Sequence, residues 1–167
     1  NRPEITWTQV PKERAQRIVD ISLDGKRILF GNVETQMLTV YDLQTEQTMW
    51  QIPMDFSAAI TSRWSPDGRQ IAAIVDGNIS ILDAANGDHI SEIESSLKKY
   101  EDLLRVLTTS EKLGYTDFKW SSDSKQLSAL SHGYIIVYDI STESISTVVD
   151  LVIISSGDLR EYLHKFD

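Results

Sequence analysis

The sequence contains no cysteine and few of the residues that usually carry catalysis or metal binding. Its 167 residues include 0 Cys and 3 His, so a disulfide framework and thiolate chemistry are both excluded. His89, His132 and His164 are separated in the chain, and none has the His-x-x-x-His spacing of a metal site. We interpret His89 and His132 as surface or turn residues, and we predict no cofactor and no bound metal.

The sequence also lacks the short motifs that mark common active sites. There is no Gly-x-Ser-x-Gly nucleophile elbow, no glycine-rich phosphate loop and no Asp-x-Asp-x-Asp calcium loop. The sequence therefore predicts that these residues do not form an enzyme.

Positive charge and long apolar runs are missing as well. The net charge is −9 at pH 7 and no Lys/Arg pair extends into a longer run, which argues against a nucleic-acid surface. No apolar run approaches the length of a membrane span, and no signal-peptide pattern is present. We expect a soluble, cytoplasmic chain, although the lack of cysteine leaves an extracytoplasmic location open.

What the sequence does contain is a series of short apolar runs separated by turn residues. In the central stretch 60–93, Trp64-Ser65-Pro66-Asp67-Gly68 and Asp76-Gly77 are turn signals, because Pro presets φ and Gly tolerates positive φ. The apolar runs between these signals predict four short antiparallel strands. Their expected ranges are 60–64, 70–75, 79–82 and 89–93.

This unit has approximate copies on both sides. The turn signal at Asp67-Gly68 has counterparts at Asp24-Gly25 and Asp123-Ser124. An aspartate follows the third strand of every copy, at Asp42, Asp83 and Asp139. The two markers shift together from copy to copy, and an insertion precedes the third. A repeat of roughly 40–45 residues with four strands is typical of a β-propeller.

The same residues carry a family resemblance. The turn Trp64-Ser65-Pro66-Asp67-Gly68 and the dipeptides Tyr41-Asp42, Leu82-Asp83 and Tyr138-Asp139 resemble WD40 repeats. The repeats are degenerate, since the opening Gly-His dipeptide is absent and Trp-Asp has become Tyr-Asp or Leu-Asp. The turn is also similar to propellers of the TolB and prolyl-peptidase types. The resemblance implies an all-β fold of propeller blades with repeats at about 18–53, 60–93 and 115–150.

Three repeats do not complete a ring. Closed propellers usually have four to eight blades, and an incomplete ring exposes sheet edges that favour association. We therefore interpret residues 1–167 as one propeller segment, belonging to a larger protein or to an assembly. A second copy or a different chain would then complete the ring.

Two segments depart from the strand pattern and predict helices. In the insert 94–114, apolar residues recur at helical spacing. These residues are Leu97, Tyr100, Leu104 and Leu107. The predicted amphipathic helix either packs on the propeller flank or forms a partner-binding element, so its apolar stripe is the candidate binding site. Residues 157–166 show similar spacing and favour a C-terminal helix.

The repeated aspartates and tryptophans have structural interpretations. We expect Asp42, Asp83 and Asp139 to form local hydrogen bonds in turns. Trp64 and Trp120 occupy equivalent repeat positions, so we expect them to pack between blades. The function that remains is a protein–protein interaction scaffold. The alternatives are an accessory propeller domain of a larger, peptidase-like enzyme or of a TolB-like envelope protein.

Overall fold

The computed structural model describes residues 16–55, 61–95, 114–131 and 134–150. All the regular secondary structure within these ranges is β-strand, which confirms the all-β class. The predicted helical insert lies almost wholly outside the described residues, and the predicted C-terminal helix lies entirely outside them. Both helices therefore remain predictions.

The described residues form three four-stranded antiparallel sheets, which confirms the predicted blades. Each sheet follows the chain order, so strands that are consecutive in sequence are neighbours in the sheet. The first sheet contains β1 (Gln16–Ile21), β2 (Arg27–Asn32), β3 (Met37–Asp42) and β4 (Gln47–Pro53). The second contains β5 (Ser62–Trp64), β6 (Gln70–Val75), β7 (Asn78–Asp83) and β8 (His89–Ile93). The third contains β9 (Asp117–Trp120), β10 (Gln126–Ser131), β11 (Tyr134–Asp139) and β12 (Ser144–Asp150).

The turn residues adopt the backbone conformations that the sequence predicts. Gly25 and Gly68 follow the first strands of their blades with φ of 69° and 71°. In the third blade Ser124 takes the same place with φ of 61°, a left-handed conformation that a non-glycine residue adopts at a cost. Asp76 and Gly77 connect β6 to β7 with φ of 46° and 81°, as a two-residue hairpin turn requires.

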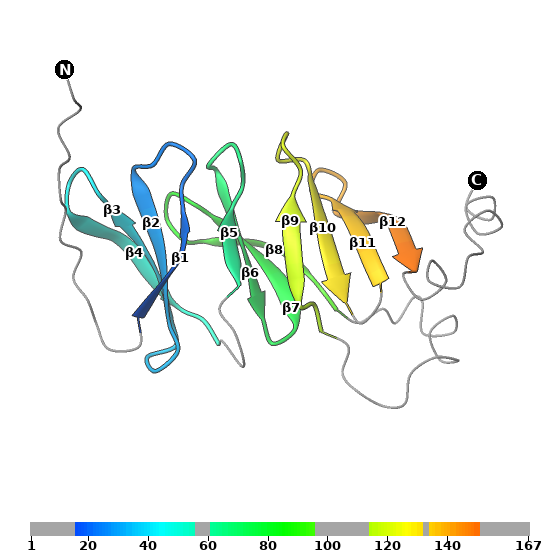
Figure 1. Ribbon diagram of the computed structural model, residues 1–167, viewed down its shortest axis with the longest axis horizontal. Coiled ribbons are helices and arrows are strands. Elements are labelled where there is room, and N and C mark those ends of the chain that lie inside the picture. The colour runs from blue at the N-terminus through cyan, green and yellow to red at the C-terminus, as the bar shows by residue number, and fades with distance from the viewer. Residues whose placement is uncertain (1–15, 56–60, 96–113, 132–133, 151–167) are drawn as a thin grey trace, which may run out of the picture.

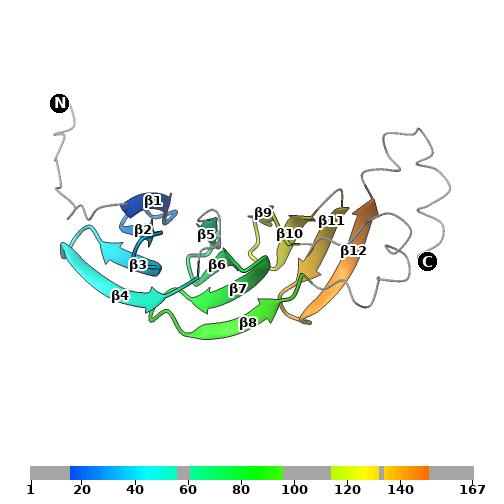
Figure 2. The same ribbon diagram turned by 90° about the horizontal axis from the view of Figure 1, so that it is seen from below.

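The three blades stand side by side in an open arc (Figure 1). Seen from below, the first strands β1, β5 and β9 lie on the inner side of the arc, and the last strands β4, β8 and β12 lie on its outer side (Figure 2). The ring is not closed by the described residues, which confirms the prediction of an incomplete propeller.

Two hydrophobic clusters hold the blades together. One lies between the first and second blades and includes Leu29, Trp64 and Ala73; the other lies between the second and third and includes Ala72 and Phe118. Adjacent residues Ala72 and Ala73 are both 0% exposed but belong to different clusters. Strand β6 is therefore buried on both faces, as its unbroken apolar sequence predicts.

Candidate interaction surface

A serine–aspartate pair fixes the turn between the first two strands of every blade. Each serine Oγ donates a hydrogen bond to the carboxylate of the aspartate two residues later. The Oγ–Oδ1 distances are 2.6, 2.7 and 2.6 Å in the first, second and third blades. The pairs are Ser22–Asp24, Ser65–Asp67 and Ser121–Asp123. The same serine oxygen also accepts a 2.9 Å hydrogen bond from the backbone amide that opens the second strand. The aspartates were predicted as turn formers; the sequence reasoning missed the serine two positions before each of them.

These hydrogen bonds stabilise the ionised form of the carboxylates. The bond from the Ser22 hydroxyl, followed by one from the Lys26 amide, lowers the pKa of Asp24 below its ordinary value. The equivalent bonds from Ser121 and Lys125 lower the pKa of Asp123. A carboxylate held in this way is a turn component rather than a proton donor or base.

The aspartates after the third strands are also engaged locally. Asp42 Oδ1 accepts 2.8 Å hydrogen bonds from the amides of Gln44 and Thr45. Asp83 Oδ1 accepts one of 2.7 Å from Ala85, and Asp139 repeats the arrangement. This confirms the structural interpretation of these three residues.

Among the described residues there is no group of three or more His, Cys, Asp or Glu side chains that could hold a metal ion. His89 is exposed at the start of β8, with Nε2 4.0 Å from Glu92 Oε2. His132 and His164 lie outside the described residues, as do Leu97, Tyr100, Leu104 and Leu107. The candidate partner-binding stripe is therefore untested. Within the described ranges there is no helix with the length and hydrophobicity of a membrane span.

Trp64 seals the contact between the first two blades. Its side chain is 6% exposed, the Arg27 guanidinium lies 4.7 Å from its ring centroid, and its backbone amide donates a 2.9 Å hydrogen bond to Asp20 Oδ2. On the outer side of the arc, Trp50 Nε1 donates to the Ala84 carbonyl over 3.1 Å. The prediction that Trp64 packs between blades is confirmed.

The contact between the second and third blades uses equivalent positions with different chemistry. Trp120 packs against the hydrophobic cluster and donates from Nε1 to the Arg63 carbonyl over 3.3 Å. The Arg63 guanidinium lies 3.4 Å from Asp117 Oδ1. At one end of this contact the Tyr115 amide donates a 2.8 Å hydrogen bond to the Gly77 carbonyl.

Each blade has one face directed toward the blade that follows it in the chain, which we call its forward face. Directly paired residues of an antiparallel sheet point to the same side, so the pairing defines equivalent rows. The first row contains Gly31, Leu38 and Ile52 in blade one, Ile74, Ile79 and Ile93 in blade two, and Leu130, Ile135 and Val149 in blade three. The second row contains Leu29, Val40 and Trp50, then Ala72, Ile81 and Ser91, then Ser128, Val137 and Thr147.

The forward face of the third blade differs from the other two in exposure. Leu38 and Ile79 are 0% exposed because the next blade covers them. Their counterpart Ile135 is only partly buried, and Leu130 beside it is 38% exposed. The first row of this face, Leu130, Ile135 and Val149, is nevertheless as apolar as the first rows of the covered faces, whereas the second row includes Ser128 and Thr147.

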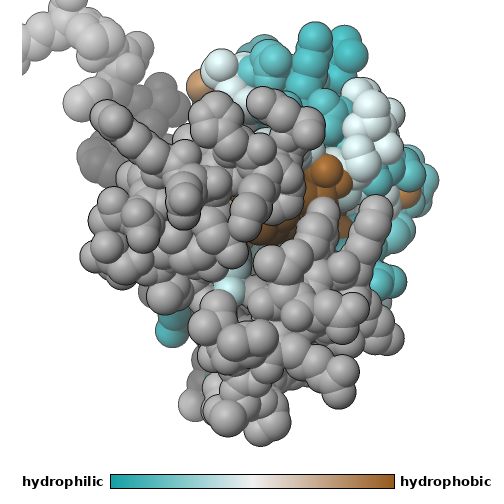
Figure 3. Space-filling view, turned by 90° about the vertical axis from the view of Figure 1, so that its right-hand side faces the viewer, coloured by the Kyte–Doolittle hydropathy of each residue, from teal (hydrophilic) through white to brown (hydrophobic). Residues whose placement is uncertain are grey.

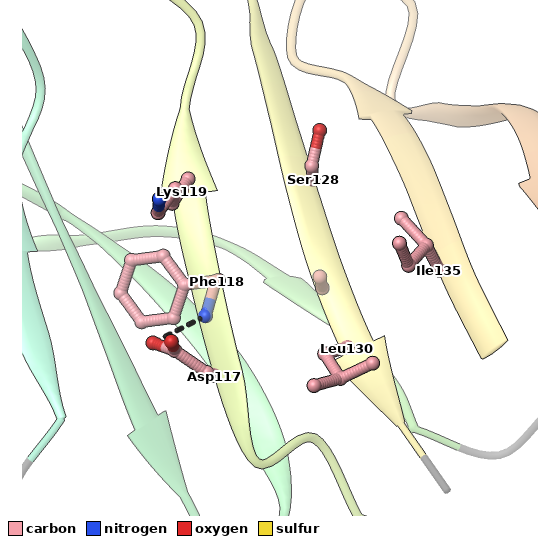
Figure 4. A pocket seen from close by; sticks show the side chains of 7 residues that line it. Asp117, Phe118, Lys119, Ser128, Leu130 and Ile135 are labelled. Atoms are coloured by element: carbon pink, nitrogen blue, oxygen red, sulfur yellow. Dashed lines mark hydrogen bonds between the residues drawn. The ribbon is translucent and has the colours of Figure 1, made fainter. Parts of the chain in front are cut away.

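This face contains a hollow of about 190 Å³. Its lining includes Lys119 from β9, Ser128 and Leu130 from β10, and Ile135 from β11, and Figure 4 shows these side chains. The view toward the third-blade end of the molecule also shows hydrophobic surface on the described residues (Figure 3). The described residues therefore offer a partly exposed apolar surface where the arc ends.

Comparisons with known proteins identify the fold. No family model and no curated protein matches the sequence. Among solved structures, the Cps50 (Swd1) β-propeller domain of Myceliophteria thermophila aligns with TM-score 0.61 at 18% identity, over 78% of this chain and 40% of that chain. The RRP9 WD40 repeats align with TM-score 0.63 at 14% identity, over 85% and 41%. BamB from Moraxella catarrhalis aligns with TM-score 0.58 at 17% identity, over 79% and 35%.

These similarities confirm that the fold is that of WD40-like β-propeller blades. The identities are too low to transfer a function. This chain spans about two fifths or less of the length of the propellers that it matches.

Proposed function

We propose that this chain is a protein-interaction scaffold, and that the forward face of its third blade is a surface on which another protein docks. The observation that carries the proposal is the contrast between Ile79 and Ile135, which occupy equivalent positions in consecutive blades. Ile79 is buried by the following blade, whereas Ile135 is partly exposed on an apolar face. Exposed apolar residues that gather on one face favour an interaction site, and Leu130 lies beside Ile135 on this face.

The remaining chemistry of the described residues supports a binding role. The repeated serines and aspartates are used in turn hydrogen bonds, so the proposal assigns no catalytic step to them. The net charge of −9 disfavours a phosphate backbone as the partner. The apolar stripe Leu97, Tyr100, Leu104 and Leu107 is retained in the proposal as a second candidate surface.

The test compares the wild-type chain with Ile135→Asp, which places a charge on the forward face of the third blade. Gln51→Asp, at an exposed position of β4, is the matched control for an added charge elsewhere. A partner is first identified by crosslinking in extracts of the source organism, then purified and titrated against all three chains by calorimetry. We expect wild type and Gln51→Asp to bind equally and Ile135→Asp to bind at least about tenfold more weakly, because a buried unpaired charge is costly. Equal binding by Ile135→Asp would refute the proposed surface.

A further inference from the structure

The two complete blade contacts show how side-chain size is matched across a junction. In the first contact the forward face carries Leu29, which belongs to the cluster between the two blades. The facing side of β5 carries the small residue Ser62, which pairs with Ala73 of the same cluster. In the second contact the forward face carries Ala72 where the first has Leu29. The facing strand β9 carries Phe118 where β5 has Ser62, since Ser62 pairs with Ala73 and Phe118 pairs with Ala129.

A small residue on the forward face is therefore matched by a large one on the next blade. Ser62 is 1% exposed and Phe118 is 2% exposed, so both combinations fill the space between sheets, as close packing requires. The third blade carries the small residue Ser128 at this position, and the hollow of about 190 Å³ lies beside it. A cavity of about 150 Å³ is enough to hold a benzene ring, so the hollow has room for one aromatic side chain.

Charge adds a second requirement. In the second contact Arg63, on the forward side, pairs with Asp117, the residue immediately before Phe118. Lys119 of the third blade occupies the position of Arg63, because Arg63 pairs with Ala72 and Lys119 pairs with Ser128. Lys119 is exposed and has no carboxylate partner among the described residues.

We propose that the forward face of the third blade docks a further propeller blade whose innermost strand carries an acidic residue followed by an aromatic one. The aromatic ring fills the hollow beside Ser128, and the carboxylate pairs with Lys119. The inference rests on the proposed function and specifies the kind of surface that the partner presents. The partner blade would make a third contact of the same type as the two blade contacts already present in the chain.

A second copy of this chain does not meet these requirements. The innermost strand of its first blade is β1, in which Ile18 pairs with Phe30 as Phe118 pairs with Ala129. Ile18 and the preceding Arg17 would therefore face the hollow and Lys119. Arg17 would bring a second positive charge to Lys119, and Ile18 is smaller than an aromatic residue. The wild-type chain should associate with itself only weakly through this face.

This mismatch provides the test, because both residues are exposed and can be changed. The double variant Arg17→Asp/Ile18→Phe gives the first blade the acidic–aromatic pair of β9. We expect this variant of residues 1–167 to associate head to tail at least about tenfold more tightly than wild type, measured by sedimentation equilibrium over a range of concentrations. Adding Ser128→Phe fills the hollow in the same chain, and the triple variant should return to the wild-type mass.

A folded double variant that keeps the wild-type mass at every concentration would overturn the partner chemistry. Wild-type chains that associate as tightly as the double variant would also overturn it, since a second copy would then be the natural occupant. Neither result affects the Ile135→Asp test of the proposed function, which uses the natural partner.

A second measurement does not depend on the folding of the double variant. Phenol is titrated into the wild-type chain, and the methyl resonances of Leu130 and Ile135 are followed by NMR. We expect saturable shifts that disappear in Ser128→Phe. The absence of shifts in the wild type would show that the hollow does not accept an aromatic ring.

Discussion

Alanine substitution at Ile79 and Ile135 tests whether the third-blade face lacks the cover that the second-blade face has. The two residues are the same amino acid at equivalent positions of β7 and β11, and each pairs with an apolar residue on both neighbouring strands. Their local sheet environments are therefore matched. The difference between them is the blade that packs over Ile79.

The expected magnitudes follow from exposure. Ile79 is 0% exposed, so Ile79→Ala removes buried methyl groups and leaves a cavity, which costs about 2–5 kcal/mol. Ile135 is partly exposed, and solvent can fill the space that its side chain leaves. Ile135→Ala should therefore lose only part of the transfer free energy, about 1 kcal/mol. The difference between the two variants is large enough to measure.

The assay is equilibrium unfolding in urea, with the free energy of unfolding obtained at constant slope. Both variants must first show the wild-type circular dichroism spectrum and the wild-type mass in solution. An Ile135→Ala cost equal to that of Ile79→Ala would refute the reasoning, because it would mean that the third-blade face is already covered within the chain. The docking proposal would then lose its surface.

Two further predictions concern the turns. Gly87→Ala should destabilise the chain by about 1–3 kcal/mol more than Gly25→Ala in the same urea assay, because overpacking adds to the cost of positive φ. Both glycines have positive φ, but an added Cβ at Gly87 would lie 2.9 Å from Trp50, whereas nothing lies within 4 Å of one at Gly25. An equal loss of unfolding free energy in the two variants would contradict this close approach. The second prediction is acid sensitivity. The hydrogen bond from Ser121 lowers the pKa of Asp123 in the folded protein. The stabilisation that the ionised carboxylate provides is therefore complete above the unfolded-state pKa of about 3.9 and is lost as pH falls through the folded-state pKa. Urea unfolding from pH 7 down to acid should show a smaller acid loss in Asp123→Asn, and an unchanged acid loss would show that this carboxylate does not contribute.

Much of the fold could be predicted because the local signals agree with one another. The ranges predicted for β6 and β8 match the structure. Turn residues bound β6 on both sides, and Asn86-Gly87-Asp88 precedes β8. The prediction was less accurate for β5, which begins at Ser62 rather than at residue 60. No turn residue marks that start, and an apolar run alone does not fix where pairing begins.

The candidate surface could not be predicted from sequence in the same way. Ile135 and Val137 are apolar, and so are Ile79 and Ile81; a sequence pattern does not distinguish a covered face from an uncovered one. The matching of Ala72 with Phe118 depends on the register of β6 and β9 within their sheets, which the sequence pattern does not specify. In the first blade the β1 bulge between Ile18 and Asp20 shifts the β1–β2 register, and no residue pattern predicted it.

The sequence of β11 nevertheless favours a packed environment for the partly exposed forward face of the third blade. An antiparallel strand with one face in solvent alternates apolar and polar residues. Residues 134–138 read Tyr-Ile-Ile-Val-Tyr, with Tyr134, Ile136 and Tyr138 buried against the second blade and Ile135 and Val137 directed away from it. A solvent face would accept polar residues at those two positions without loss of packing. Their apolar character therefore supports the proposal that a partner packs on this face.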